Sequence, residues 1–301
     1  MTATDSRPPG AEPPLCAAPD PAPRKPKLKL PALACDCHAH ICGPQSRYAY
    51  WSGRVYTPMD CLLPAYRQML RTLGVQRAVL VQPSVYGCDN TAMLDAMREA
   101  GPDFRGVAVV DETVSDVELE RMHAAGVRGL RCNIVDIVED QGKLPLAMLE
   151  RLAGKIKPFG WHIELLMHAD EFPAMDRAFA DFPVDIVLGH LGYQRAEKGI
   201  DDPGFQALLR LMRAGKAWVK LTGPYRISSQ GVPYPDTVPF AQALLEAAPE
   251  RVVWGSDWPH VMVKGPMPND GDLCDLLAGW IPDATLRQRV LVDNPARLYG
   301  F

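Results

Sequence analysis

The stretch CDCHAHIC, residues 35–42, packs three cysteines and two histidines into eight positions. Its alternation is typical of a β-strand, in which successive side chains point to opposite faces. Asp36, His38 and His40 would then share one face, and the opposite face would carry Cys35, Cys37, Ala39 and Ile41. We predict a strand over residues 34–41 with the cysteines packed against helices. The two histidines would be inward neighbours, about 6.5–7 Å apart, able to converge on one metal ion or one substrate oxygen.

Outward from this stretch, the chain repeats a short apolar run followed by a helical pattern. Further strands are predicted at 77–82, 105–110, 127–132, 161–167, 184–189, 217–222 and 251–256. Several helical stretches between them, such as PAYRQMLRTLG, end at glycine, which suits the left-handed residue of a helix stop. Eight alternating strand–helix units predict an α/β fold, the (β/α)8 TIM barrel. The alternative is an open doubly wound sheet, but no G-x-G-x-x-G follows the first strand.

The first 30 residues differ in composition from the rest of the chain. They are rich in proline and charge, and they lack the apolar segment of a signal peptide. Such a composition cannot form a packed core of its own. We therefore predict a flexible, disordered proline-rich arm over residues 1–30 and a single barrel domain over residues 31–301.

Composition also limits the classes of partner. The net charge of -4 argues against a nucleic-acid or anionic-membrane surface, which would require an excess of basic residues. No apolar run approaches the roughly 18 residues of a membrane span. Eight cysteines without a secretory signal or a CxxC pair indicate reduced thiols. We expect a cytoplasmic protein with no nucleic-acid or membrane partner, and the sequence does not indicate an oligomeric state.

Polar residues follow the predicted strands at the end where a barrel places its active site. A zinc finger is a poor alternative for CDCHAHIC, because no second ligand pair lies at the required spacing. Polar groups from units far apart in sequence would instead meet at one mouth: His38, His40, Gln82, Ser84, Asp111, Arg131, Asn133, Glu164, His168, His190, Thr222, Tyr225, Arg226, Asp257 and His260.

Three motifs in order make the chain recognisable: DCHAH in the first strand, GHLG after the sixth and GSDWPH after the last. They resemble the amidohydrolase superfamily and, within it, the lactone hydrolases that include 2-pyrone-4,6-dicarboxylate lactonase. The segments RYAYWSGRVYTP, VLVQPSVYGCDN, VKLTGPYRIS and VDNPARLYGF also look like that group, so the resemblance spans about residues 34–301. It implies a hydrolase that opens a carboxylated lactone, in the breakdown of aromatic compounds or sugar acids.

The resemblance assigns catalytic roles to four residues at the mouth. Asp257 ends the last strand and would be the general base that takes a proton from water. His38, His40 and His190 would polarise the lactone carbonyl and stabilise the oxyanion.

Substrate binding is assigned to five further residues. Arg131 and Arg226 would bind substrate carboxylates, because the guanidinium fork binds two oxygens at once. Three residues would add weaker hydrogen bonds to the substrate: Ser84, Tyr56 and Asn133.

Two alternatives to this mechanism stay open. The three histidines and Asp257 also match the ligand types of a Zn2+ site, which would lower the pKa of bound water to about 7. The chain would then be a zinc-dependent hydrolase or decarboxylase of the same superfamily, although the resemblance favours no metal and no cofactor. The other alternative is a non-catalytic barrel that binds a ligand. The base and electrophilic groups at the mouth argue against it.

The loop after the fourth strand, NIVDIVEDQGK, departs from the pyrone-dicarboxylate pattern. Ile137 stands where that group carries a second arginine, and Asp136, Glu139 and Asp140 make the loop acidic. An acidic loop would repel a second substrate carboxylate. We therefore expect the reaction type to transfer better than the substrate, with a lactone that bears a single carboxylate. A dicarboxylate pyrone stays open because both predicted arginines are present.

Overall fold

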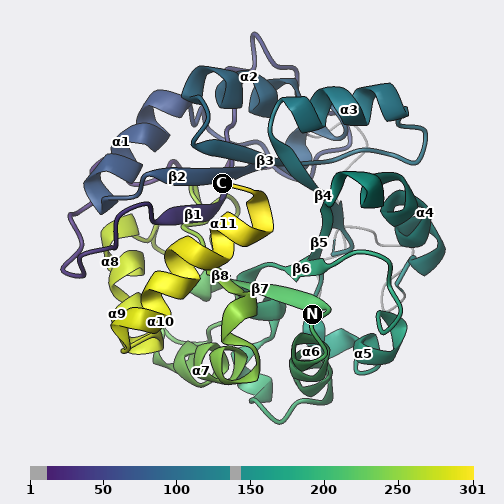
Figure 1. Cartoon of the computed structure of the whole chain (residues 1–301). Coiled ribbons are helices and arrows are strands. Elements are labelled where there is room, and N and C mark those ends of the chain that lie inside the picture. Colours follow the sequence, from purple (N-terminus) through teal and green to yellow (C-terminus); the bar gives the residue numbers. More distant parts are fainter. Residues whose placement is uncertain (1–11, 136–143) are drawn as a thin grey trace.

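The computed structural model of this protein describes residues 12–135 and 144–301. Eight parallel strands pair in chain order and form a ring surrounded by helices (Figure 1). Backbone contacts between His40 and Trp258 join the first strand to the segment after the last. This confirms the predicted (β/α)8 barrel. The strands are β1 Cys35–Ala39, β2 Arg77–Val81, β3 Phe104–Ala108, β4 Val127–Asn133, β5 His162–Leu166, β6 Ile186–Leu188, β7 Ala217–Leu221 and β8 Val252–Trp254.

Amphipathic helices cover the outside of the ring. In α1, Leu63–Leu73, the buried residues Tyr66, Leu70 and Leu73 recur at helical spacing, and the helix ends at Gly74 with φ 79°. No helix within the described residues is long and apolar enough to cross a membrane. The other helices are α2 Thr91–Ala100, α3 Asp116–Ala124, α4 Leu146–Ile156, α5 Met175–Ala178, α6 Pro203–Arg213, α7 Val238–Ala247, α8 Asp270–Asp275, α9 Leu277–Trp280, α10 Ala284–Gln288 and α11 Asn294–Tyr299.

The barrel interior corrects one prediction about β1. Cys35 and Cys37 do not face the helices: they pack in the interior with valines from four other strands. Asp36 points outward instead, where it accepts a hydrogen bond from the Tyr66 hydroxyl of α1, at 2.9 Å. The interior group comprises Cys35, Cys37, Val79, Val81, Val107, Val187, Trp218, Val253 and Tyr299.

A β-bulge explains why the histidines nevertheless face inward. Asp36 pairs with Ala78 and Ala39 pairs with Leu80, so three residue steps on β1 match two on β2. The extra residue reverses the alternation of side chains along the strand. The inward positions are therefore Cys35 and Cys37 before the bulge and His38 and His40 after it. Simple period-two alternation does not reveal such a switch.

The end of the barrel where the strands begin is closed by α11, which crosses the ring in Figure 1. Its Tyr299 is buried in the interior against the ring of His162 at the start of β5, with ring centroids 5.4 Å apart. The opposite end, where the strands finish, carries the polar residues predicted from the sequence.

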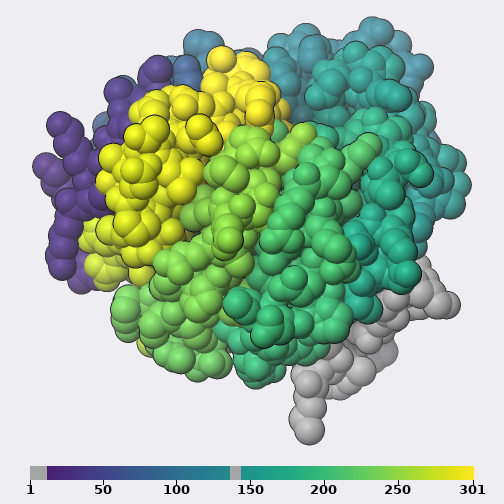
Figure 2. Space-filling view, turned by 60° about the horizontal axis from the view of Figure 1, so that its bottom comes forward, coloured from purple at the N-terminus to yellow at the C-terminus, as the bar shows by residue number. Residues whose placement is uncertain are grey.

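The N-terminal segment differs from the predicted disordered arm from residue 12 onward. Thr57 exchanges backbone hydrogen bonds with Pro14 and Cys16, both 2.8 Å. Farther along, the amides of Arg24 and Leu28 donate to side chains at the start and end of α8. Figure 2 shows purple N-terminal residues beside the yellow C-terminal ones. The barrel thus supplies the partners that this proline-rich segment cannot provide for itself. Residues 1–11 of the predicted arm lie outside the described residues.

Candidate active site

Four predicted catalytic residues lie together where β1, β6 and β8 end. The ring of His38 lies 4.9 Å from that of His40 and 5.1 Å from that of His190, measured between centroids. Asp257 lies 3.7 Å from His38 (Oδ1 to Nε2) and 3.9 Å from His190 (Oδ2 to Nδ1). All four side chains are almost completely buried. The structure therefore forms the predicted cluster from segments more than 200 residues apart in sequence.

The backbone at this cluster adopts conformations that side chains rarely tolerate. Asp257 has φ 67° and His190 has φ 51°, both in the left-handed region. Such strain persists only where the surrounding structure fixes it, and it is common at functional sites. Here the amide of Asp257 donates to the carbonyl of His38 at 2.8 Å, which fixes the aspartate relative to β1.

Asp257 is held by two donors from the segment after β7. Arg226 Nε and the Tyr225 hydroxyl each donate to its Oδ2 at 2.6 Å. Burial opposes ionisation, but the charge of Arg226, aided by His190 and His38, holds the pKa of Asp257 well below its usual range. The other oxygen, Oδ1, has no hydrogen-bond partner within the described residues. Asp257 is thus an ionised carboxylate with one oxygen available to a proton donor.

A second set of contacts supports Tyr225. Its hydroxyl oxygen lies 2.9 Å from His260 Nδ1, and His260 Nε2 lies 3.1 Å from Asp270 Oδ1 at the start of α8. His260 and Asp270 are both buried. The His260 side chain therefore contacts Tyr225, while its backbone amide donates to the carbonyl of Asp257 at 2.7 Å.

A buried ion pair that the sequence analysis did not identify lies beneath His38. Lys220 of β7 contacts Glu164 of β5, with Nζ 2.6 Å from Oε2, and Glu164 Oε1 lies 3.2 Å from His38 Nδ1. Burial would raise the pKa of Glu164, but Lys220 and His38 outweigh it and hold that pKa well below the usual range. Lys220 could have been noticed in the sequence, because it is a lysine at an inward position of the apolar run AWVKLT. A charge there requires a partner.

Asp36 is a second residue whose contribution was missed. It accepts hydrogen bonds from the amide of Ser256 at 2.8 Å and from the amide of His38 at 3.1 Å. Burial raises the pKa of Asp36 to about 6, although its hydrogen-bond donors oppose that shift. Asp36 therefore ties β1 to the segment after β8, and so fixes the separation of His38 from Asp257.

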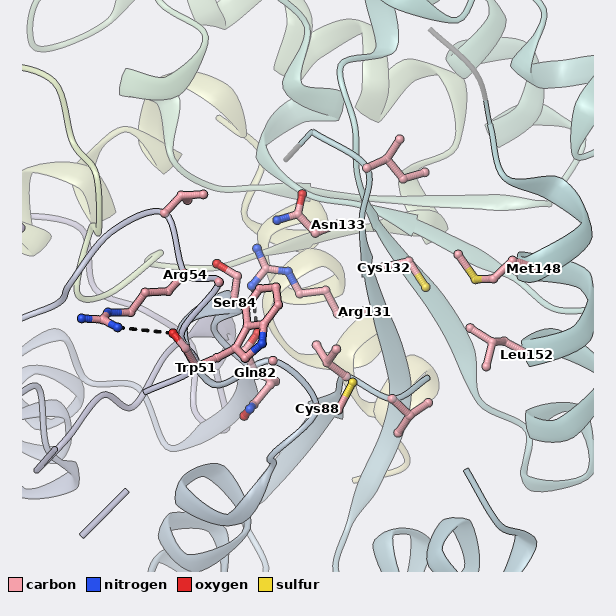
Figure 3. A pocket seen from close by; sticks show the side chains of 16 residues that line it. Trp51, Arg54, Gln82, Ser84, Cys88, Arg131, Cys132, Asn133, Met148 and Leu152 are labelled. Atoms are coloured by element: carbon pink, nitrogen blue, oxygen red, sulfur yellow. Dashed lines mark hydrogen bonds between the residues drawn. The ribbon is translucent and has the colours of Figure 1, made fainter. Parts of the chain in front are cut away.

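A cavity of about 550 Å³ opens at the ends of β2, β3 and β4 (Figure 3). Arg131, Ser84 and Asn133 gather at one part of its wall, whereas Cys132, Met148 and Leu152 make another part apolar. Its lining residues are Trp51, Gly53, Arg54, Val55, Gln82, Ser84, Gly87, Cys88, Val109, Val110, Arg131, Cys132, Asn133, Ile134, Met148 and Leu152.

Arg131 connects this cavity to the histidine cluster. Its Nη1 donates to the carbonyl of Gln82 at 2.9 Å, and its charge lowers the pKa of both His40 and His190, for which burial is the larger cause. Tyr56 is buried next to the cavity and shares a hydrogen bond with Ser84. Four of the five predicted substrate-binding residues therefore lie in or beside the cavity.

Arg226 is the exception among the predicted substrate-binding residues. It does not line the cavity, because its guanidinium group is held by Asp257 and by the carbonyl of Val261, the latter at 3.0 Å. The acidic residues Asp136, Glu139 and Asp140, and Ile137 with them, lie outside the described residues.

Part of the predicted zinc ligand set has suitable geometry. His38, His40 and Asp257 offer donor atoms that all lie within 4.8 Å of one another, and nitrogen with carboxylate oxygen is a ligand set that zinc accepts. His40 Nδ1 lies 2.7 Å from the carbonyl of Val81, which can only accept, so a neutral His40 presents Nε2 as a lone pair. His190, the fourth predicted ligand, is not part of this group.

The histidines and the aspartate lie at the ends of the strands, where enzymes with a (β/α)8 barrel build their active sites. The family model described as amidohydrolase matches residues 35–301, and this chain belongs to that family.

Several relatives of this chain are enzymes that act on lactones. The chain is 40% identical to a 2-pyrone-4,6-dicarboxylate hydrolase of Comamonas testosteroni, with 92% of this chain and 93% of that protein covered. It is 38% identical to a 4-sulfomuconolactone hydrolase of Rhizobium radiobacter, with 90% and 91% covered. A D-galactarolactone isomerase of Agrobacterium fabrum is 31% identical, with 78% and 80% covered.

Two solved structures also match this chain over about nine-tenths of its length. A probable 2-pyrone-4,6-dicarboxylic acid hydrolase from Acinetobacter baumannii, with citric acid bound, superposes with a TM-score of 0.78 at 26% identity. That match covers 89% of this chain and all of the other. A candidate enzyme of the same name from Pseudomonas putida gives a TM-score of 0.77 at 34% identity, with 90% and 98% covered.

Proposed function

We propose that this protein is a lactonase, which opens the cyclic ester of a carboxylated small molecule with water. The observation that carries the proposal is Asp257, an ionised buried carboxylate whose Oδ1 has no hydrogen-bond partner within the described residues, in a cluster with His40 and His190, the two histidines whose pKa values Arg131 of the cavity wall helps to lower. The lactone hydrolases among the relatives, at 38–40% identity over nine-tenths of the chain, support the same reaction. A cytoplasmic location and breakdown of aromatic compounds are parts of this proposal.

In this mechanism Asp257 takes a proton from water as the water attacks the lactone carbonyl. The carbonyl oxygen then develops negative charge and requires a donor. Of the three histidines, His38 and His190 suit that role, because His38 Nε2 and His190 Nδ1 have no hydrogen-bond partner in the described chain, whereas His40 already donates from Nδ1 to the carbonyl of Val81. We therefore assign polarisation of the carbonyl to His38 and His190, two of the three histidines that the sequence suggested.

The cavity supports a substrate with at least one carboxylate. Arg131 lines it, and a guanidinium group binds a carboxylate through two hydrogen bonds. Arg226 is engaged by Asp257, so a second substrate carboxylate would have to compete for it. This supports a lactone with a single carboxylate near Arg131, in line with the prediction made from the loop after β4.

The test is direct hydrolysis in the presence of a chelator. Purified protein is mixed with 2-pyrone-4,6-dicarboxylate, or with a monocarboxylate lactone, and the ring is followed by its ultraviolet absorbance or by release of acid. We expect turnover of at least one carboxylated lactone, faster than that of an uncharged lactone of the same ring size. Absence of turnover on the whole panel, with and without added zinc, would contradict the proposal.

A zinc-dependent hydrolase or decarboxylase is the second candidate, favoured by the convergence of His38, His40 and Asp257. These residues would hold the ion, which supplies a bound water of lowered pKa. Stoichiometric metal in the purified protein, together with loss of activity on chelation, would select this candidate over the first.

A further inference from the structure

The cavity at the ends of β2, β3 and β4 offers one cationic group to a ligand. Of the described residues that line it, only Arg54 and Arg131 are charged. Arg54 is already engaged, because it pairs with Glu12 and donates to Thr57 Oγ1 at 3.2 Å. The cavity therefore matches a ligand with a single anionic group, which would bind at Arg131.

Another part of the cavity wall is apolar and comes from three elements. Val109 and Val110 follow β3, Cys132 lies in β4, and Met148 and Leu152 lie one turn apart on α4. All of these side chains except Leu152 are only half-buried, so apolar surface at this wall is left in contact with water. Covering such surface with an apolar group of a ligand is favourable.

The polar and apolar parts of the wall lie on different sides of β4. Arg131 and Cys132 are neighbours in this strand, so their side chains point to opposite faces. In Figure 3 the guanidinium group of Arg131 lies near Ser84 and Asn133, whereas Cys132 lies on the side of Met148. The cavity thus extends across the end of β4, from Arg131 to an apolar wall on α4.

The cavity is also larger than a lactone ring requires. Its volume is about 550 Å³. A cavity of about 150 Å³ is enough to enclose a benzene ring. A small carboxylated lactone at Arg131 would therefore leave the apolar wall in contact with water. A second carboxylate against that wall would lose its hydration without gaining a hydrogen-bond donor, which is unfavourable.

We propose that the substrate is a lactone with one carboxylate, bound by Arg131, and one apolar alkyl or aryl substituent, which packs against Val110, Cys132 and Met148. These three residues then determine specificity and take no part in the chemical step. This inference rests on the proposed lactone hydrolysis and names the class of lactone that the cavity selects.

A set of 2-pyrone-6-carboxylates tests the apolar substituent, with hydrogen, methyl, propyl or carboxylate at ring position 4. A second set exchanges positions 4 and 6, so that the result does not depend on which position carries the carboxylate. In the faster set, kcat/KM should rise by about two- to fourfold for each added carbon, the gain expected from burying one CH2 group. The dicarboxylate should be opened more slowly than the propyl form.

Met148→Gln is the most informative variant, because glutamine keeps the length of the side chain and the helix propensity but introduces a polar group. The ratio of kcat/KM between the propyl and hydrogen forms should fall by about five- to tenfold, with kcat/KM for the hydrogen form within about twofold of wild type. Comparing this ratio between the two proteins cancels the intrinsic reactivity of each ring. Val110→Thr, which has the same shape, should lower the ratio in the same way.

Met59→Gln is the matched control for this substitution. Met59 is 41% exposed and is not among the described residues that line the cavity. The same chemical change at this position should therefore leave the ratio between the propyl and hydrogen forms at its wild-type value.

Binding of simple carboxylates separates the cavity from the reaction. Acetate, butyrate and hexanoate are titrated into the full chain by isothermal calorimetry. In the wild type, Kd should fall by about two- to fourfold for each added methylene, and the fall should be smaller in Met148→Gln.

Three results would overturn the inference. One is a kcat/KM that does not rise with the length of the substituent or is highest for the dicarboxylate. Another is an unchanged ratio in both Met148→Gln and Val110→Thr, and the third is an equal Kd for acetate and hexanoate. If no lactone of either set is opened, the proposed function fails for these rings. A Kd that falls from acetate to hexanoate, and falls less in Met148→Gln, would still support the apolar wall as a binding site.

Discussion

The mouth of the barrel has two unlike halves. The half at the ends of β1, β6 and β8 is closed and charged, with His38, His190 and Asp257 almost completely buried and each in contact with another member of the cluster. The half at the ends of β2, β3 and β4 is a cavity of about 550 Å³, partly apolar, with Arg131 on its wall.

We infer from this difference that the charged half carries out the reaction and that the cavity half selects the substrate. In the charged half, Asp36, Glu164, Lys220 and Arg226 each contact His38 or Asp257, so substitutions there should slow the reaction itself. The cavity half has fewer mutual contacts and space for variation, so change there should alter the choice of lactone.

Asp257→Asn tests the charged half most severely. The amide keeps the shape but accepts protons poorly, so kcat should fall by about 10²–10⁴-fold while KM changes little. Steady-state kinetics on the best lactone measure this. Asp185→Asn is the control, since Asp185 pairs with Arg251 at 2.9 Å near the start of β6, away from the mouth. A variant at 257 that kept its kcat would show that another group is the base.

Arg131→Gln tests the cavity half. Loss of a charge-assisted hydrogen bond of about 1.5–3 kcal/mol should raise KM for a carboxylated lactone by roughly 10–100-fold, with a smaller effect on kcat. KM for an uncharged lactone should stay unchanged, and that contrast is the measurement. Arg128→Gln, in the same strand but at its opposite end, should have no effect on either substrate. Equal losses on charged and uncharged lactones would remove Arg131 from carboxylate binding.

The pH profile sharpens the comparison. Burial opposes ionisation of Asp257 but Arg226 outweighs it, and burial also lowers the pKa of all three histidines. The histidines should therefore give no limb at or above pH 7, whereas protonation of Asp36, whose pKa burial raises to about 6, should lower kcat/KM near that pH, and Asp257 should give a further acid limb below about pH 4. Arg226→Met should move the Asp257 limb upward, because burial then acts unopposed. A limb at or above pH 7 in the wild type would contradict these shifts.

The same ion pair has a consequence for stability. The folded pKa of Asp257 lies below its unfolded value, so the pair stabilises the fold above about pH 4. That contribution is lost as the pH falls through the folded pKa. Comparison of Tm for the wild type and Arg226→Met from pH 7 down to about pH 2 measures it, because the difference between the two proteins should shrink below about pH 4.

Tyr56→Phe should give the smallest effect of the series. It removes one hydroxyl, which shares a hydrogen bond with Ser84 beside the cavity, and such a bond contributes about 0.5–1.5 kcal/mol. We expect KM to rise by roughly two- to tenfold with kcat retained. Tyr48→Phe is the control, because its hydroxyl bonds to Asp95 at 2.8 Å on another element. A large fall in kcat would show that Tyr56 acts in the reaction together with the residues of the charged half.

The sequence was sufficient to predict the barrel and to predict that His38, His190 and Asp257 lie together at its mouth. All eight strands lie within about two residues of the predicted ranges, because apolar runs and glycine stops are local signals. His38, His190 and Asp257 could be grouped because the barrel itself brings strand ends together. The roles assigned to them remain predictions.

What the sequence could not provide were pairings between distant residues. The bulge in β1 depends on its register with β2, the partner of Glu164 comes from β7, and the engagement of Arg226 by Asp257 depends on the turn after β7. The docked segment from residue 12 onward was missed for the same reason, since its proline-rich composition shows no packing of its own. None of these contacts produces a periodic pattern in the amino-acid sequence.

The docking of that segment also affects the order in which the chain folds during synthesis. The hydrogen bonds from Arg24 and Leu28 to Asn269 and Asp275 span 245 and 247 residues. Contacts so distant in sequence form late, after the loop between them has closed. During synthesis the part of the segment around Arg24 and Leu28 leaves the ribosome long before α8, so this part has no docking site until the last strand and α8 have been made. Its ordering would therefore report that the ring has closed.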